Sequence, residues 1–128
     1  MKMNAEHLVP LSTQVLAVLN ELYPLTGRYE LLFPSRDNPA KCISTNTILY
    51  AMYRLGYHRT ATPHGLRATA ATILSEMEFK PDVIERQLAH AERNQTRAAY
   101  LRAEYLQERR HMMQAWSVFV AGLTGGKP

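Results

Sequence analysis

The chain has 128 residues, 46% of them hydrophobic, which suffices for one domain, or part of one, with a buried core. Fifteen lysines and arginines oppose eleven acids, and the net charge of +4 is compatible with nucleic-acid binding. A single cysteine excludes an intramolecular disulfide framework. The sequence has neither a signal-peptide pattern nor an apolar run of about eighteen residues, which excludes membrane classes and predicts a cytoplasmic protein.

The first elements are predicted from apolar runs and their stop signals. Residues 7–10 form a short apolar run closed by proline, which predicts the last strand of a small antiparallel sheet. Ser12 or Thr13 can cap a helix that ends near residues 24–27, and a loop is expected over residues 35–41. The apolar face of this helix comprises Val15, Leu16, Val18, Leu19 and Leu22.

A second helix is expected from Ser44 to Gly56, and a third begins with Thr62 as its cap. In the third helix, His64 and Arg67 lie three residues apart near the positive end and point away from the core, where a phosphate could meet both the arginine and the helix N-terminus. The predicted buried stripes are Ile48, Leu49, Met52 and Leu55, then Leu66, Ala70, Ile73, Leu74 and Met77.

Two further helices complete the prediction. One begins at residues 80–82 and runs through Gln87, presenting His90 at its end and turning Val83, Ile84 and Leu88 inward. The other follows Glu104 and is strongly amphipathic, with a glycine-rich, flexible tail expected over residues 124–128. Its inward side comprises Tyr105, Met112, Trp116, Phe119 and Leu123, and its charged outer side Glu108, Arg109 and Arg110.

Positive charge is concentrated in the middle of the chain. No carboxylate occurs from residue 38 to residue 75. This stretch contains Lys41, Arg54, His58 and Arg59 besides the His64 and Arg67 pair, so we expect it to form a positive surface that contacts DNA phosphates. The alternative is a solvated face whose acids lie elsewhere in the sequence.

Three short sequences occur in a fixed order: residues 62–70 read TPHGLRATA, residues 84–90 read IERQLAH and residues 97–100 read RAAY. This order closely resembles the tyrosine recombinases, specifically the prophage and genomic-island integrases, which carry an HxxR box, a leucine-small-histidine box and a tyrosine. The intervals here are 3, 23 and 10 residues. The resemblance implies a mainly α fold with a small N-terminal antiparallel β remnant, namely a catalytic domain truncated at its N-terminal side.

The resemblance also implies a role for each matching residue. Tyr100 would attack the scissile phosphate and form a 3′-phosphotyrosyl link, while Arg67 would bind the non-bridging oxygens. His64 would assist proton transfer from the phenol, and His90 would hydrogen-bond the phosphate. Lys2, at the place of a family lysine before the valine-proline strand end, would protonate the leaving 5′-oxygen. Neither ATP, metal nor cofactor is required.

The expected partner is double-stranded DNA at attachment sites, with Arg93 and Arg97 as further contacts. The full-length protein would self-associate as a tetramer on DNA, and whether the last helix packs on its own chain or on a neighbour stays open. Residues 1–123 would be the C-terminal part of the catalytic domain. The family's first catalytic arginine lies upstream of the lysine, so this chain is expected to be a fragment that is inactive alone.

Two other classes remain. A non-enzymatic helical DNA-binding module would explain the basic stretch but not the spacing of Tyr100 from His90. A metal-dependent nuclease could use His58, His64 and His90, yet these lack a ligand spacing and nearby carboxylates. Tyr105 is a second possible nucleophile, but on a continuous helix it points about 140° away from Tyr100, so we predict Tyr100.

Overall fold

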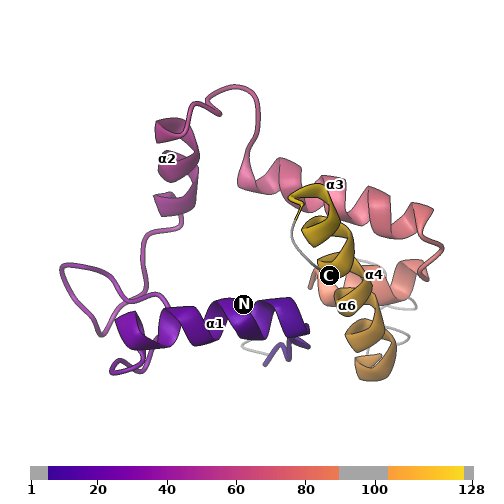
Figure 1. Cartoon of the computed structure of the whole chain (residues 1–128), viewed down its shortest axis with the longest axis horizontal. Helices are drawn as coiled ribbons and strands as arrows, with labels where there is room; N and C mark the ends of the chain where they lie inside the picture. Colours follow the sequence, from indigo (N-terminus) through magenta and orange to yellow (C-terminus); the bar gives the residue numbers. More distant parts are fainter. Residues whose placement is uncertain (1–5, 90–103, 126–128) are drawn as a thin grey trace, which may run out of the picture. The chain divides into compact units, whose positions relative to one another are not determined.

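The computed structural model describes residues 6–89 and 104–125, and this part of the chain is helical (Figure 1). The helices are α1 (Thr13–Thr26), α2 (Thr47–Arg54), α3 (Pro63–Glu76), α4 (Pro81–Gln87) and α6 (Leu106–Leu123). The chain divides into two compact units, residues 1–15 with 73–128 and residues 16–72. Within the described ranges, no helix has the length and apolar character needed to cross a membrane.

The strand expected over residues 7–10 is not observed, since residues 6–12 have no regular secondary structure. Residues 1–5 lie outside the described residues. The polar groups of this stretch bond to helices instead of to a neighbouring strand. The Leu8 carbonyl accepts a hydrogen bond from Arg109 Nη2, and His7 Nε2 lies 3.0 Å from the Gln87 carbonyl oxygen. The mainly α part of the prediction is confirmed, and the β remnant is not.

The start of α1 follows the prediction. Ser12 is its cap, since the Val15 N–H donates to Ser12 Oγ at 3.2 Å, and the helix continues through Pro24 to Thr26. On its apolar face, Val15, Leu16 and Val18 are exposed.

The end of α2 shows why glycine occupies position 56. Gly56 has φ of +90°, its N–H donates to the Tyr53 carbonyl, and the Tyr57 N–H donates to the Met52 carbonyl, each at 3.0 Å. These two bonds form a Schellman motif, in which a left-handed glycine closes the helix. The start of α2 is later than expected: Ser44 Oγ accepts the Asn46 N–H at 3.3 Å in a turn, and the helix begins only at Thr47.

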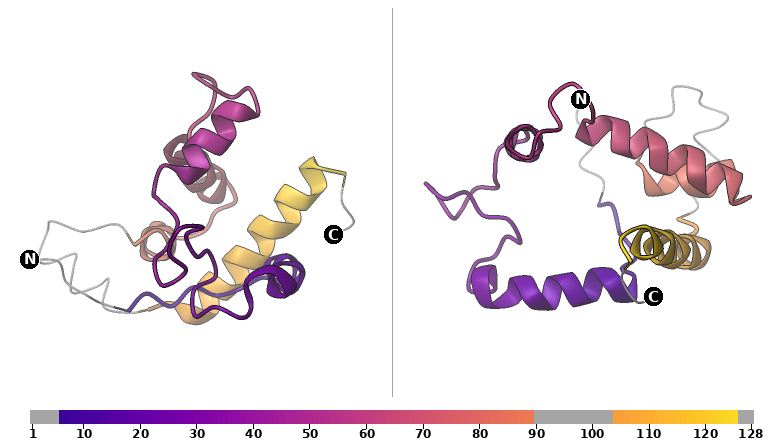
Figure 2. Two further views of the ribbon diagram at one scale, coloured as in Figure 1. Left: turned by 90° about the vertical axis from the view of Figure 1, so that its left-hand side faces the viewer. Right: turned by 45° about the horizontal axis from the view of Figure 1, so that its top comes forward.

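The buried core lies in the first unit, where α4 packs on α6 (Figure 1, Figure 2). Its apolar members are Leu74, Val83, Ile84 and Met112, all predicted to face inward. Burial of each such side chain contributes about 1.5–3 kcal/mol relative to exposure. Leu123, expected on the same inward side, is instead 70% exposed.

The second unit differs, because no side chain of residues 16–72 is fully buried. Ile48, Leu55 and Leu66 were predicted to be buried and are exposed. A short segment with few helices buries only a small fraction of its surface, so it does not cover every apolar helix face. The apolar residues of this unit therefore recur at the helical period without being buried.

Candidate functional site

The start of α3 is fixed by a local cap, as predicted. The Gly65 N–H donates to Thr62 Oγ1 at 2.9 Å, and Pro63 occupies the first helical position, where its missing N–H costs nothing. A Cβ placed on Gly65 would lie 3.1 Å from Thr62 Oγ1, which is tighter than an ordinary contact. The cap and the glycine between His64 and Arg67 therefore fit each other closely.

His64 and Arg67 project from the first two turns of this capped helix. His64 is exposed and Arg67 is half-buried, so the predicted outward direction is confirmed fully for the histidine and only partly for the arginine. Thr69 and Thr72 use their hydroxyl hydrogens along the helix, donating to the Gly65 and Ala68 carbonyls at 2.9 and 3.1 Å. His64 and Arg67 carry nitrogen groups of the type that bind anions.

The loop between α2 and α3 carries the next basic side chains. The His58 ring packs edge-on against the Tyr53 ring, with centroids 4.4 Å apart, and Arg59 adopts a left-handed φ of +63°. Beside them is a hollow of about 290 Å³ that opens next to the α3 cap. It is lined by Arg59, Thr60, Ala61, Thr62, Gly65, Leu66 and Thr69.

Exposure supports the expected positive surface of the second unit. Lys41, Arg54, His58, Arg59 and His64 are all exposed. Because no carboxylate occurs between residues 38 and 75, this stretch of the sequence carries only positive formal charges. A surface of this kind attracts polyanions, and its attraction weakens as salt screens it.

The remaining predicted site residues, namely Lys2, His90, Arg93, Arg97 and Tyr100, lie outside the described residues. Their convergence on the His64 and Arg67 helix therefore stays a prediction. One supporting assumption was wrong. Tyr105 is the left-handed N-cap of α6, with φ of +48°, so the helix does not continue back through it and the 140° separation from Tyr100 does not follow.

Metal chemistry has no visible site in the two described ranges. No three His, Cys, Asp or Glu side chains come together there in a way that could hold a metal ion. His58 and His64 are within these ranges, whereas His90, the third histidine of the nuclease alternative, is not.

Arg109 departs from the prediction that it lies on the charged outer side of the last helix. It is 1% exposed. Its Nε donates to Gln87 Oε1 at 2.9 Å, its Nη1 to the Glu104 carbonyl at 3.1 Å, and its Nη2 to the Leu8 carbonyl. Burial and the nearby Arg86 cation lower the pKa of Arg109, and Glu104 partly opposes this shift.

The signal for this burial was present in the amphipathic pattern. Tyr105 and Met112 are seven residues apart on the inward side, and Arg109 fills the position four residues after the first and three before the second. Its charge argued for solvent, but its position argued for the interior. Arg109 is buried as its helical position predicts, and three oxygen acceptors satisfy its guanidinium there.

The polar junction around Arg109 includes two more basic side chains. His7 Nε2 contacts the Gln87 carbonyl at 3.0 Å. His7 Nδ1 and Arg86 Nε are buried, and among the described residues neither has a hydrogen-bond partner. Buried polar atoms of this kind normally have a hydrogen-bond partner, so these two atoms are unsatisfied within the part of the chain that the structure describes.

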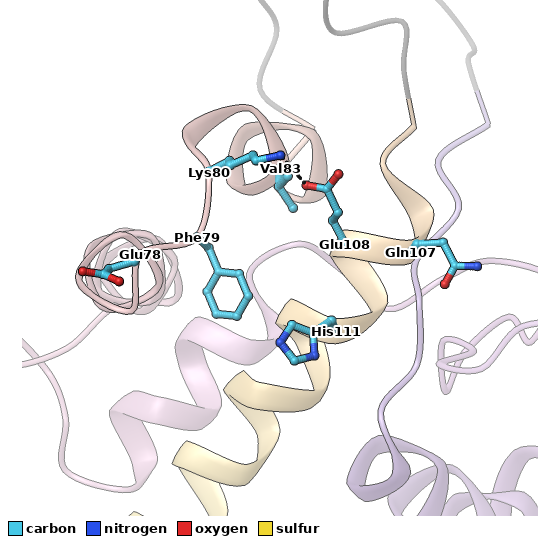
Figure 3. Close-up of a pocket in the computed structure, with 7 residues that line it drawn as sticks. All are labelled: Glu78, Phe79, Lys80, Val83, Gln107, Glu108 and His111. Atoms are coloured by element: carbon cyan, nitrogen blue, oxygen red, sulfur yellow. Dashed lines mark ion pairs between the residues drawn. The ribbon is translucent and has the colours of Figure 1, made fainter.

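A second hollow, of about 380 Å³, lies in the first unit and is shown in Figure 3. The Phe79 and His111 rings meet there at 5.8 Å between centroids. Lys80 and Glu108 form a 3.5 Å ion pair at its rim, and both are exposed enough that the pair adds little stability. It is lined by Glu78, Phe79, Lys80, Val83, Gln107, Glu108 and His111, and none of these is a predicted site residue.

Comparison with known proteins shows the family. Residues 1–107 match the model of the phage integrase family. The prophage integrase IntA of Escherichia coli (strain K12) is 45% identical over 126 residues, which are 98% of this chain and 30% of the relative. The integrase of Enterobacteria phage P4 is 44% identical over 94% of this chain and 28% of its own length, and that of Shigella phage Sf6 is 39% identical over 91% and 31%.

The chain therefore belongs to the phage integrase family and is a tyrosine recombinase family member. It spans under a third of the length of these curated relatives. No solved structure shows significant similarity to it.

Proposed function

We propose that this chain supplies catalytic and DNA-contacting residues for site-specific integration, in which double-stranded DNA is cut and rejoined at attachment sites. The observation that carries the proposal is the capped start of α3, which holds His64 and Arg67 one turn apart beside an exposed cationic loop. Membership of the phage integrase family supports the same reaction class.

In the proposed reaction Tyr100 is the nucleophile. Its phenol oxygen forms a bond to the scissile phosphorus, the bond from phosphorus to the 5′-oxygen breaks, and a 3′-phosphotyrosyl link remains. Lys2 gives its proton to the departing 5′-oxygen. The 5′-hydroxyl of a second strand then attacks the link and releases the tyrosine, so the bond energy is conserved and no nucleotide cofactor is consumed.

Arg67 and the two histidines act on the phosphate. The planar guanidinium of Arg67 binds two non-bridging oxygens, where negative charge grows in the transition state. His64 assists removal of the phenol proton, and His90 donates a hydrogen bond to the phosphate. A free phenol has a pKa of about 10, so the surrounding cations are needed to favour phenolate at neutral pH.

Contacts with the DNA backbone are proposed for the exposed basic side chains Lys41, Arg54, His58 and Arg59, and for Arg93 and Arg97. We also propose that residues 1–123 belong to the catalytic domain, with residues 124–128 as a tail, and that the longer protein assembles as a tetramer on DNA. A non-enzymatic DNA-binding module draws on the same exposed cations and is the alternative.

The proposal is tested by replacing the matching region of the Escherichia coli prophage integrase IntA with residues 1–128. The chimera is incubated with a nicked attachment-site substrate in EDTA. We expect a covalent DNA adduct at Tyr100, which is lost in Tyr100→Phe and kept in the matched control Tyr105→Phe. Binding without an adduct would favour the non-enzymatic module, and cleavage that stops in EDTA would favour a metal nuclease.

A further inference from the structure

Arg109 joins three separate segments of the first unit. Its guanidinium bonds to the Gln87 side chain at the end of α4, to the Glu104 carbonyl just before α6 and to the Leu8 carbonyl near the N-terminus. These three donors lie in one plane with fixed directions, so the three acceptors must keep fixed positions relative to one another.

Two of these contacts are made by residues that flank, in the sequence, the stretch containing His90 and Tyr100. Gln87 precedes His90 by three residues, and Glu104 follows Tyr100 by four. The contact between Arg109 and both flanks therefore sets how far apart the end of α4 and the start of α6 lie. Its third acceptor, Leu8, is six residues after Lys2.

Packing alone does not require an arginine at this position. Arg109 lies on the same face as Met112, which is fully buried, and an apolar side chain would continue that face. All three of its hydrogen-bond acceptors are neutral oxygens, so the buried cation gains no direct ion pair from them, and desolvation opposes its charge. A buried cation at this position is better explained by the geometry that it imposes than by its contribution to stability.

We propose that Arg109 is a positioning residue for strand cleavage, because it holds the end of α4 and the start of α6 at the separation that the histidine and the tyrosine require. This inference rests on the proposed function of Tyr100. It assigns no contact between Arg109 and DNA, and it places the effect of Arg109 on the chemical step and not on DNA affinity.

The first test uses the 128-residue chain itself and needs no activity. Spin labels are attached at the exposed positions 89 and 107 (Ala89→Cys and Gln107→Cys) after the exposed Cys42 has been changed to serine. We expect one narrow distance distribution in the parent and a broader or shifted one in Arg109→Lys and in Gln87→Ala. The neighbouring exposed residue supplies the control, Arg110→Lys, which should leave the distribution unchanged.

The second test measures single-turnover cleavage by the chimera with prophage integrase IntA at saturating DNA. A misplacement of about 1 Å can slow a reaction by about 10²-fold, so Arg109→Lys should lower the rate constant strongly while the DNA dissociation constant stays within about twofold. A merely structural role would instead reduce the fraction of active protein and leave the rate constant alone. Adding Gln87→Ala to Arg109→Lys should cost less than the two single effects combined.

The outcomes separate the two proposals. An unchanged distance distribution in both variants, or an unchanged rate constant in Arg109→Lys with a normal Tyr100 adduct, would overturn the positioning role. Absence of any adduct in the parent chimera would overturn the proposed function, and the spin-label distances would still decide whether Arg109 fixes the two helix ends.

Discussion

The hydroxyl oxygens of Ser12 and Ser117 lie 2.6 Å apart, and both side chains are buried. Ser12 Oγ also accepts the Val15 N–H at 3.2 Å, so one small side chain caps α1 and bonds to the middle of α6. Gln114, one turn before Ser117, reinforces this contact by accepting the Thr13 N–H at 3.0 Å. A local capping signal thus becomes a tertiary contact across about a hundred residues of sequence.

This pair gives a stability prediction. Ser12→Ala removes a cap and leaves the buried Ser117 hydroxyl with one partner fewer, so it should lower the free energy of unfolding by about 1–3 kcal/mol. Ser117→Ala should cost less, because the cap remains. Urea unfolding of the 128-residue chain measures both, with the exposed Ser75→Ala as control. Strict additivity in the double variant would show that the two hydroxyls are not coupled.

The sequence predicted helix ends well where the signal is local. Thr62 and Ser12 cap α3 and α1, and Gly56 ends α2, because each of these roles depends on one side chain or one backbone angle within a few residues. The prediction that Ser44 opens α2 was wrong, because a local bond of the same kind also forms in turns. The Ser44 hydroxyl accepts a local N–H, but in a turn that precedes the helix.

Burial was predicted less well, because it depends on what packs against a stripe. Leu66 lies at the expected helical period and is 57% exposed, while Arg109, expected in solvent, is buried. The first unit has α4 and α6 in contact, and the predicted core residues Val83, Ile84 and Met112 are buried there. The periodicity of apolar residues identifies the apolar face of a helix, but it does not identify the element that packs against that face.

The left-handed Gly56 gives a second prediction with a control of opposite sign. Nothing lies within 4 Å of a Cβ placed on Gly56, so Gly56→Ala should be unfavourable for conformational reasons alone, by about 1 kcal/mol. Gly122 is also open to a Cβ but lies inside α6, so Gly122→Ala should stabilise the chain by up to about 1 kcal/mol. Thermal unfolding measures both, and equal signs would refute the backbone explanation.

The sequence predicted which residue types form the candidate site and how they are spaced along the chain. The structure adds how one helix of this site, α3, begins and which of its side chains are exposed. His64 is exposed at the capped start of α3, as expected for a group that meets a substrate. The meeting of this helix with His90 and Tyr100 is a long-range relationship, and spacing along the chain specifies order but not distance. That part of the site therefore remains a prediction.

Arg67 provides the third prediction. As the ligand of two phosphate oxygens it should tolerate lysine poorly, since one ammonium cannot reproduce the paired contact. Arg67→Lys in the chimera should leave folding intact and slow cleavage by about 10²-fold or more. The exposed Arg54, proposed to contact only backbone phosphate, supplies the control: Arg54→Lys should change the rate little. An equal loss in the two variants would argue against a special role for Arg67.

The last two predictions concern residues 1–128 tested by themselves. Their DNA affinity should be weak and fall steeply with salt, because it rests on a few exposed cations that displace counterions from the duplex. Each phosphate contact contributes about −0.9 to the slope of log affinity against log salt. Changing Lys41, Arg54 and Arg59 together to glutamine should therefore flatten the slope by about 3. Lys80→Gln, in the other unit and already paired with Glu108, is the control.

The same 128 residues should form little or no Tyr100 adduct on a suicide substrate. The resemblance to the tyrosine recombinases assigns a further catalytic arginine to a position before Lys2, and the curated relatives are matched over only 28–31% of their length. Without one preorganised cation the transition state loses about 3 kcal/mol or more, which slows cleavage by at least 10²-fold. Efficient adduct formation, or tight binding that is indifferent to salt, would show instead that another residue of this chain supplies the missing charge.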